Sequence, residues 1–380
     1  AIIAVVGESM KNYQGLSGQM FSALGKNNVN VRAIAQGSSE KNISAVINKK
    51  DAKKALNTLH EQFFGEKIKQ LNLFVTGVGN VGERFLAQIH KQNEFLKENL
   101  KLTIRVIGIS NSRKMVFDSD GINLDNWKER LENGAPTSID SFYNKVKESN
   151  HRNSVFIDNT ANQQVSEVYE KYLRQSISVV TCNKIACASS YENYKTLKEI
   201  SRKFNASFLF ETNVGASLPI IGTLNDLIRS GDKVNKIEAV LSGTLNFVFN
   251  NYEGGKDGKS FAQVVRQAQE EGYTEPDPRL DLGGTDVMRK VMILAREAGH
   301  PLEMESIENE AFLPASCFDG SVADFYDEME KQEPHFKKLY DAAIAAGSKL
   351  KFVAKFEIDA NGQGSAKVGL QHIQPSSDFY

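Results

Sequence analysis

Residues 71–89 read LNLFVTGVGNVGERFLAQI, and this stretch decides the fold of the chain around it. The apolar run 71–76 predicts a buried strand, and apolar residues at helical spacing over 81–96 predict a helix directly after it. A strand, a tight glycine turn and a helix in immediate succession are typical of the first unit of a parallel, dinucleotide-binding sheet.

The turn between this strand and helix has the spacing GxGxxG. In such a turn Gly77 permits the tight bend, Gly79 lets the backbone approach a pyrophosphate, and Gly82 lets the helix pack on the strand. Asn80 and Val81 open the helix, whose N-terminus would face the phosphate charge. We therefore predict that a dinucleotide binds here. The alternative is a glycine-rich turn without a ligand.

Strands and helices continue to alternate on the C-terminal side of this turn. Short apolar strands separated by longer helical stretches imply parallel βαβ units. Residues 67–212 are therefore predicted to form a Rossmann NAD(P)-binding domain, with a polar connection over 112–150 that holds a short helix at 127–131. The further strands are expected at 103–109, 155–158, 178–181 and 207–211.

The two ends of the chain differ from this pattern. Residues 1–66 predict a small α/β unit of order β-α-β-β-α, with Asp51 as the cap of its second helix. Residues 213–380 predict a second, α+β domain. Its helices are expected at 217–229, 260–271, 285–298 and 333–346, and its strands at 236–242, 350–358 and 364–370.

The composition excludes several functional classes. The 380 residues include 46 basic and 47 acidic ones, and the net charge of −1 favours neither nucleic acid nor an anionic membrane as the main partner. No apolar run reaches the roughly 18 residues of a membrane span. Three cysteines without a CxxC pair suggest neither a disulfide framework nor a zinc site, so a reducing, cytoplasmic setting is expected. The start lacks both a signal peptide and a Met, so we expect a fragment.

The loop after the second strand bears on cofactor choice. An NAD-selective site usually has an acidic residue here for the ribose hydroxyls, whereas a basic residue suits a 2′-phosphate. This chain has Ser-Asn-Ser followed by Arg113 and Lys114. We therefore expect NADP(H) to be preferred over NAD(H), with Arg113 as a contact and Lys114 as a second candidate. The alternative is a solvated basic loop.

Polar residues follow two later strands, where ligands bind in parallel sheets. Thr160 lies in the sequence DNTA, and Lys184 lies in TCNK. Lys184 could reach cofactor or substrate, and the alternative for it is a surface lysine. Residues 211–219, ETNVGASLP, follow the last strand, and their small side chains would admit a ligand or an ion, or would simply form a helix entry.

Residues 272–290 form the densest polar segment. Prolines and glycines make 275–284 an irregular loop, and the helix after it carries Asp286 and Lys290 four residues apart. A lysine beside an apolar surface can have a lowered pKa and transfer protons near neutrality, although the alternative is an ordinary exposed ion pair. The carboxylates favour a site for a substrate ammonium group over a metal site, since no histidine is nearby. They are Glu275, Asp277, Asp281 and Asp286.

These motifs, in their order along the chain, resemble the homoserine dehydrogenase family. The start of the chain, with VVGESM, GLSGQMFSALGKNNVNV and NISAVI, resembles the end of an ACT-type aspartokinase regulatory region. Together they are similar to a bifunctional aspartokinase–homoserine dehydrogenase that lacks its kinase domain. The dehydrogenase motifs are GVGNVG, TCNK, ETNVGASLP, LSGTLNFVF and GYTEPDPRLDLGGTDVMRK.

The resemblance implies a partial ACT-type unit, a Rossmann domain and an α+β catalytic and dimerisation domain. The implied reaction interconverts L-aspartate 4-semialdehyde and L-homoserine with NAD(P)H, in threonine and methionine biosynthesis. Lys290 matches the family's acid/base lysine. Glu275 and Asp286 match the carboxylates that hold the substrate's amino group, and Asp281 lies beside them.

Further roles follow from the same resemblance. Lys184 matches a lysine at the cofactor–substrate junction, and Thr160 matches a residue near the nicotinamide. Threonine is implied as an effector, and a homodimer or higher homo-oligomer as the assembly. A structural sodium ion is implied, held mainly by backbone carbonyls at Glu211, Val214, Ala216 and Leu218.

The chain departs from the family at three positions: Leu280 replaces a frequent aspartate, Cys182 a proline and Ile185 a lysine. The family also continues with a glycine-rich loop and a closing helix, so we expect a C-terminal truncation. Two alternative functions remain. One is a regulatory and assembly module without turnover, and the other is a Rossmann dehydrogenase of a different amino-acid aldehyde.

Overall fold

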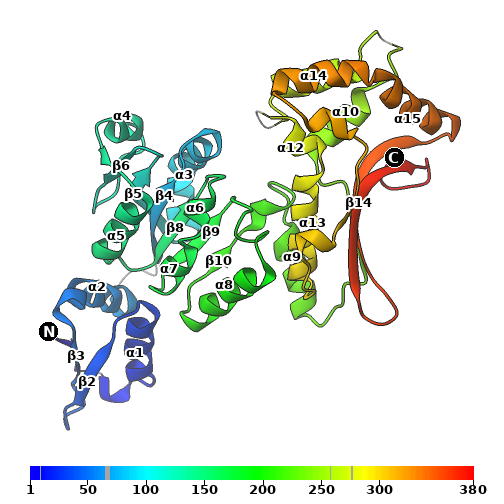
Figure 1. Ribbon diagram of the computed structural model, residues 1–380. Helices are drawn as coiled ribbons and strands as arrows, with labels where there is room; N and C mark the ends of the chain where they lie inside the picture. The colour runs from blue at the N-terminus through cyan, green and yellow to red at the C-terminus, as the bar shows by residue number, and fades with distance from the viewer. Residues whose placement is uncertain (9, 65–68, 257, 275–276) are drawn as a thin grey trace. The chain divides into compact units, whose positions relative to one another are not determined.

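The computed structural model describes residues 1–8, 10–64, 69–256, 258–274 and 277–380, and the chain divides into two compact units (Figure 1). The first comprises Ala1–Ala186 and Glu192–Phe210, and the second comprises Cys187–Tyr191 and Glu211–Tyr380. The boundary expected near residue 66 falls outside the described residues.

The start of the first unit has the predicted β-α-β-β-α order. The three strands form an antiparallel sheet of order β1-β3-β2, and the burial of alternate residues in β3 places Ile43, Ala45 and Ile47 in the core. The prediction that Asp51 caps the second helix is wrong in one respect, because its side chain makes no capping hydrogen bond. The elements are β1 (Ile2–Val6), α1 (Leu16–Lys26), β2 (Val31–Gln36), β3 (Asn42–Ile47) and α2 (Ala52–Phe63).

The rest of the first unit is built on a seven-stranded sheet of order β10-β9-β8-β4-β5-β6-β7. Strands β10 to β5 of this order are parallel, while β6 and β7 are antiparallel. The chain order reverses between β4 and β8, and ligands bind at such a switch point. The strands are β4 (Lys69–Thr76), β5 (Leu102–Ser110), β6 (Lys114–Phe117), β7 (Ala135–Pro136), β8 (Ser154–Asp158), β9 (Ser178–Thr181) and β10 (Phe208–Leu209).

Helices cover both faces of this sheet (Figure 1). On one face Leu73 and Val75 pack with residues of α3 and α4. On the other face Phe156 stacks on Tyr172 of α7 at a ring distance of 4.1 Å and contacts Phe142 of α5. The helices are α3 (Asn80–Asn99), α4 (Trp127–Glu132), α5 (Ile139–Ser149), α6 (Gln163–Ser166), α7 (Tyr169–Leu173) and α8 (Tyr191–Lys203).

Two sequence predictions need correction here. The connection 112–150 was expected to hold one helix, but the structure adds the strands β6 and β7 and the helix α5, which Ser138 caps in a capping box with Ser141. The strand expected at 207–211 is shorter, because a 3₁₀ turn at Glu211–Asn213 follows β10 closely.

The second unit is α+β, as predicted. A four-stranded sheet of order β11-β13-β14-β12 packs against helices, and α13 contributes Val287, Val291 and Met292 to the core. The sequence analysis missed α10 and α14. The elements are α9 (Ile220–Arg229), β11 (Lys236–Ala239), α10 (Gly243–Asn251), α11 (Phe261–Glu270), α12 (Arg279–Leu282), α13 (Thr285–Glu297), β12 (Glu308–Glu310), α14 (Val322–Lys331), α15 (Glu333–Ala345), β13 (Lys349–Ile358) and β14 (Gly364–Ile373).

Two further properties agree with the composition. Among the helices of the described residues, none has the length and apolarity needed to cross a membrane. The thiols of Cys182, Cys187 and Cys317 are free, so no disulfide joins them.

Candidate active site

The glycine turn between β4 and α3 is packed too closely to accept larger residues. Gly77 has φ of 88°, a conformation that glycine adopts readily. A Cβ on Gly77 would lie 2.7 Å from Cγ2 of Thr160, and a Cβ on Gly82 would collide with the carbonyl oxygen of Gly77. Both glycines are therefore required by the fold of the turn itself.

Gly79 differs from these two glycines. Apart from Gly79 itself and its chain neighbours, no atom of the described residues lies within 4 Å of the position that its Cβ would take, so its surroundings are open. It is the N-cap residue of α3 and offers no side-chain cap, which leaves the N–H groups of the first helical turn for an outside acceptor. The open approach at Gly79 is what a dinucleotide pyrophosphate requires.

A cavity of ≈ 910 Å³ adjoins this turn at the carboxyl ends of β4 and β5. Thr76, Gly77, Ser110 and Thr160 line it, together with residues of α7 and the entry of α5. The Nδ2 of Asn159 is buried beside the turn and has no hydrogen-bond partner among the described residues. The chain therefore offers a nicotinamide dinucleotide a cavity of suitable place and chemistry.

The loop after β5 presents one basic side chain freely. Oδ1 of Asn111 accepts hydrogen bonds from the backbone N–H groups of Arg113 (2.8 Å) and Lys114 (2.7 Å), which fixes the loop. Nζ of Lys114 donates to the carbonyl oxygen of Glu132 at 3.0 Å, whereas Arg113 is exposed. Arg113 is therefore the better placed of the two predicted contacts to a 2′-phosphate.

Thr160 and Lys184 lie on loops that follow neighbouring parallel strands. Asp158 at the end of β8 pairs in register with Thr181 at the end of β9, and each loop begins directly after its strand. Thr160 also packs against the glycine turn through its methyl group. The structure thus brings Thr160, Gly77 and the loop of Lys184 to the same edge of the sheet.

In the second unit, Lys290 forms the ion pair that its spacing predicts. Its Nζ lies 2.7 Å from Oδ2 of Asp286 and donates to the carbonyl oxygen of Leu241 at 2.7 Å. The side chains of Lys290 and Asp286 are 16% and 28% exposed. The pair is therefore neither buried nor freely solvated, and one turn of α13 (yellow in Figure 1) holds it.

The segment 241–244 contacts both predicted substrate-binding elements. It contributes the carbonyl of Leu241 to Lys290, and Thr244 Oγ1 lies 3.4 Å from Oδ1 of Asp281. The single hydrogen of the Thr244 hydroxyl is donated to the carbonyl oxygen of Tyr273, which is the closer acceptor. The sequence marks this segment only through its resemblance to the family and gives no other sign that it lies between α12 and α13.

One of the predicted carboxylates is already paired with an arginine, and another is not described by the structure. Glu275 lies outside the described residues. Asp277 accepts hydrogen bonds from Nε and NH2 of Arg279 at 2.9 and 2.7 Å, and this guanidinium holds the pKa of Asp277 below its usual value. Because Arg279 already neutralises Asp277, this carboxylate is poorly suited to bind a substrate ammonium group.

The residues predicted to hold sodium surround the start of α9. The carboxylate of Glu211 accepts hydrogen bonds from the backbone N–H groups of Ile221 (2.8 Å) and Gly222 (2.7 Å) and so caps this helix. In the loop between Glu211 and α9, Gly215 and Ala216 both have positive φ, of 80° and 52°. Val214 is buried and Leu218 exposed, and the sodium site at Glu211, Val214, Ala216 and Leu218 stays a prediction.

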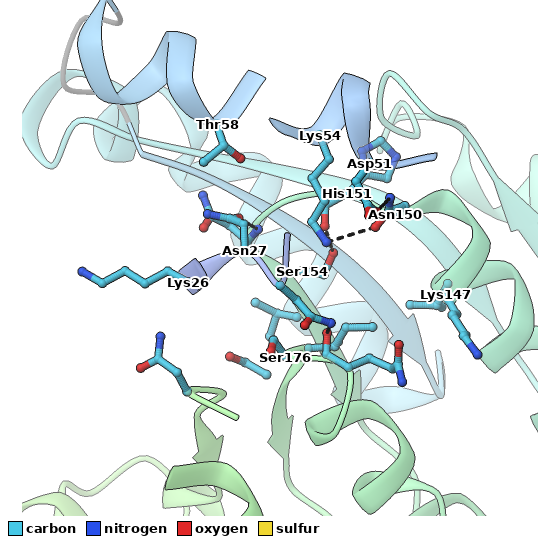
Figure 2. Close-up of a pocket in the computed structure, with 18 of the residues that line it drawn as sticks. Lys26, Asn27, Asp51, Lys54, Thr58, Lys147, Asn150, His151, Ser154 and Ser176 are labelled. Carbon is cyan, nitrogen blue, oxygen red and sulfur yellow. Dashed lines mark hydrogen bonds between the residues drawn. The ribbon is translucent and has the colours of Figure 1, made fainter. Parts of the chain in front are cut away.

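A second cavity, of ≈ 1210 Å³, lies at the opposite, amino ends of the parallel strands. Lys69, Ser154 and Ser178 line it from the start of β4, β8 and β9, facing residues of α1 and α2. Figure 2 shows Lys54 beside Asn150. The Nζ of Lys54 donates a hydrogen bond to Oδ1 of Asn150 at 3.0 Å. Because dinucleotides bind at the carboxyl ends of such strands, this cavity is distinct from the dinucleotide site.

One buried arginine is not identified by any pattern in the sequence. The side chain of Arg296 on α13 is 0% exposed and donates to the carbonyl oxygens of Cys187 (2.8 Å) and Ser189 (2.7 Å). It also pairs with Glu303 at 2.9 Å. This arginine fastens the segment 187–191 to the rest of the second unit, and no local pattern marks that role, because Cys187 and Ser189 lie more than 100 residues away in the sequence.

Comparison with known families agrees with this architecture. The homoserine dehydrogenase NAD-binding domain matches residues 77–211, the homoserine dehydrogenase catalytic family matches residues 219–380, and an ACT domain matches residues 3–63. The chain belongs to the homoserine dehydrogenase family. The resemblance of its motifs, its α/β fold class and the presence of an NAD-binding domain are thereby confirmed.

The most similar homoserine dehydrogenases include bifunctional proteins. A bifunctional aspartokinase/homoserine dehydrogenase of Haemophilus influenzae is 39% identical over 383 residues, covering 100% of this chain and 46% of the relative. A chloroplastic one of Arabidopsis thaliana is 40% identical over 359 residues, covering 93% and 39%. The chain thus spans less than half the length of these curated relatives.

Solved structures show the same fold. A Candida auris protein of unknown function is 31% identical, has a TM-score of 0.68 and covers 82% of this chain and 86% of its own. A hyperthermophilic archaeal homoserine dehydrogenase in complex with NADPH is 21% identical, with a TM-score of 0.61 and coverage of 81% and 84%. At this identity the archaeal structure supports the fold alone.

Proposed function

We propose that this chain interconverts L-aspartate 4-semialdehyde and L-homoserine with a nicotinamide dinucleotide. The observation that carries the proposal is the contact of Lys290 with both Asp286 and the carbonyl of Leu241, on a chain whose other unit has an open glycine turn and adjoining cavity. Family membership supplies the substrate pair, since the geometry alone would suit other amino-acid aldehydes.

The residues at the glycine turn suit the cofactor. Gly79, Asn80, Val81 and Gly82 would hold its pyrophosphate through backbone N–H groups, while Gly77, whose own N–H donates to the carbonyl oxygen of Ser110, would shape the turn. Thr160 and Lys184 would contact it farther along the sheet edge. When bound, the nicotinamide supplies or takes up the hydride. We further propose that NADP(H) is preferred, because Arg113 is an exposed cation on the loop after β5 where no carboxylate stands.

Lys290 is proposed to handle the proton of the reaction. In the reductive direction the carbonyl oxygen of the aldehyde becomes an alkoxide and needs a proton, which the Nζ of Lys290 gives up. Asp286, at 2.7 Å, and the carbonyl of Leu241 aim that ammonium group. In the oxidative direction Nζ takes the proton back.

The acidic side chains are proposed to select an amino-acid substrate. Asp286 and Asp281 would bind its ammonium group, together with Glu275. Asp277 is left out of this set, because Arg279 already neutralises its charge.

Turnover by this chain tests the proposal directly. L-Homoserine with NADP⁺ should give an increase in absorbance of the reduced nicotinamide, and a panel of other amino-acid alcohols should react more slowly. Reaction with a different alcohol only would indicate another Rossmann dehydrogenase. Tight NADPH binding without any turnover would oppose activity in this segment, and neither binding nor turnover would favour an assembly module.

Three finer properties are also proposed. Self-association as a homodimer or higher oligomer is supported by Ile2 and Val6, which stay exposed on the outer face of the N-terminal sheet. Threonine is the proposed effector, because the N-terminal unit is an ACT domain; calorimetry without a threonine signal would oppose it. The free thiols agree with a cytoplasmic location.

A further inference from the structure

Asp158, at the end of β8, is a fully buried carboxylate that the proposed reaction does not use. Its exposed fraction is 0%, and neutral groups surround it. Oδ1 accepts the backbone N–H of Thr160 at 2.7 Å, and Oδ2 accepts the hydroxyl of Tyr169 at 2.5 Å and Nδ2 of Asn183 at 3.1 Å. A buried charge held this way demands an explanation, since burial without a cation is costly.

The hydrogen bonds around Asp158 run in one direction. The hydroxyl of Tyr169 has a single hydrogen, which goes to the carboxylate, so its 2.8 Å contact with Thr181 must use the hydrogen of the Thr181 hydroxyl. The Oγ1 of Thr181 in turn accepts the backbone N–H of Asn183 at 2.8 Å. The chain therefore leads from Asn183 through Thr181 and Tyr169 to one acceptor, the ionised carboxylate.

This network joins the two loops that carry the cofactor-facing residues. The loop of Thr160 is fixed by the bond from its N–H to Asp158. The loop of Lys184 is fixed through Asn183, whose Nδ2 donates both to Asp158 and to the carbonyl oxygen of Asn162 at 3.0 Å, while Oδ1 accepts the N–H of Ile185 at 3.1 Å. One carboxylate thus bonds directly to both loops.

We propose that Asp158 is a positioning residue, which acts through Tyr169 and Asn183 to hold the loops of Thr160 and Lys184 in the register that cofactor binding and turnover need. The inference rests on the proposed function for the roles of Thr160 and Lys184, and on the hydrogen bonds alone for the network. Asp158 itself has no contact with substrate or cofactor in this scheme.

The network depends on the charge of Asp158. Burial raises the pKa of its carboxyl, while the hydrogen bonds from Tyr169, Thr160 and Asn183 oppose this rise. The titratable groups that face it are Tyr169 and Tyr172 on α7 and the Cys182 thiol after β9, while Thr76, its partner on β4, does not titrate. If Asp158 is protonated, the new hydrogen takes up one of its lone pairs and points toward a neighbouring donor, so one of the hydrogen bonds to the carboxyl is weakened or lost.

The decisive experiment compares two tyrosine hydroxyls that each donate to a carboxylate. Tyr169→Phe removes the bond to Asp158, and Tyr252→Phe removes a 2.7 Å bond to Glu333 in the core of the second unit. NADPH affinity by fluorescence, kcat, KM and the melting temperature are measured for both. Thr181→Val, which interrupts the same chain, and the double variant with Tyr169→Phe complete the set.

We expect Tyr169→Phe to weaken NADPH binding or kcat/KM about tenfold, as for other hydrogen bonds to charged groups. We also expect its acid-side loss of NADPH binding to move to higher pH, because a donor that favours ionised Asp158 is gone. The double variant should lose little more than either single variant. Tyr252→Phe should change the melting temperature without moving the NADPH affinity or its pH profile.

Two outcomes would overturn the positioning role. One is a Tyr169→Phe protein whose NADPH affinity and pH profile match the wild type, and the other is strictly additive loss in the double variant. A wild type that binds NADPH but does not oxidise homoserine contradicts the proposed function instead, because the binding measurements on the variants still judge the network. Equal effects of Tyr169→Phe and Tyr252→Phe on binding would reduce the role to general stability.

Discussion

The end of β8 and the first turn of α13 each hold an important carboxylate, in opposite surroundings. Asp158 is fully buried and, within the described part of the chain, forms no ion pair, so neutral hydroxyl and amide donors balance its charge. Asp286 is partly exposed and pairs with the ammonium group of Lys290 at 2.7 Å.

The difference separates holding a structure from moving a proton. Neutral donors around a buried charge make a rigid arrangement that fails when the charge is lost, since each donor needs the same acceptor. An ion pair near the surface can exchange its proton with substrate or water and keep its geometry. The first unit therefore contains a positioning centre, and the second contains a centre suited to acid–base chemistry.

The largest expected effect comes from breaking the ion pair. Lys290→Ala should lower kcat for homoserine oxidation by roughly 10²–10⁴-fold, the usual contribution of a positioned acid or base, with NADPH affinity unchanged. Lys290→Arg keeps the charge but cannot give up a proton, so it should be nearly as impaired. Arg289→Ala, on the exposed side of the same turn, is the control. Full activity in Lys290→Arg would show that only the charge matters.

The glycine turn gives the next largest effect, in two separable forms. Gly82→Ala places a methyl group against the carbonyl oxygen of Gly77, so it should lower both the melting temperature and NADPH affinity. Gly79→Ala meets open space in the protein and should leave the melting temperature unchanged while NADPH affinity falls about tenfold. Calorimetry and fluorescence measure the two quantities, and unchanged affinity in Gly79→Ala would contradict the phosphate-binding role.

A smaller effect is expected for cofactor choice. Arg113→Ala should raise the KM for NADPH about tenfold, as for loss of one charge-assisted hydrogen bond, and leave the KM for NADH as it is. Lys128→Ala removes another exposed cation of the first unit, paired with Glu83 at 2.5 Å, and serves as the charge control. Equal changes in both KM values would refute contact of Arg113 with the 2′-phosphate.

The smallest expected effect concerns how the free energy of unfolding depends on pH. Because burial raises the pKa of Asp158 above its unfolded value, its contribution to folding is most favourable below the unfolded pKa and is lost as pH rises through the folded pKa. Asp158→Asn cannot ionise. Its free energy of unfolding should therefore gain relative to wild type as pH rises from the acidic range toward neutrality. Urea unfolding at several pH values measures this slope, and a difference that is constant with pH would contradict the assignment.

Several features were accessible from the sequence because they are local. The glycine turn depends on backbone conformation within six residues, and the ion pair of Asp286 and Lys290 depends on the four-residue period of one helix. Helix α5 was missed, although Ser138 and the apolar spacing of Phe142 and Val146 were available as signals. The polar composition of residues 112–150 favoured a loop in the prediction, although the local pattern of this helix was present.

Other features could not have been found in this way, because their partners are distant in the sequence. The carbonyl that Lys290 contacts is 49 residues away, and that of Cys187, which Arg296 contacts, is 109 residues away. Asp277 was grouped with the substrate carboxylates, since nothing in the sequence shows that Arg279 turns back onto it. Such pairings depend on how loops fold, and periodicity carries no information about that.

The sequence by itself determined the strand–turn–helix at Gly77, the parallel sheet around it and the family of the chain, since each depends on short-range spacing or on motif order. The tertiary structure decided which polar groups share a site. It placed Asp158, Tyr169 and Asn183 around one buried charge because the parallel strands β8 and β9 end at the same edge of the sheet. Adjacent strand ends bring distant residues together, and only the folded chain defines which residues these are.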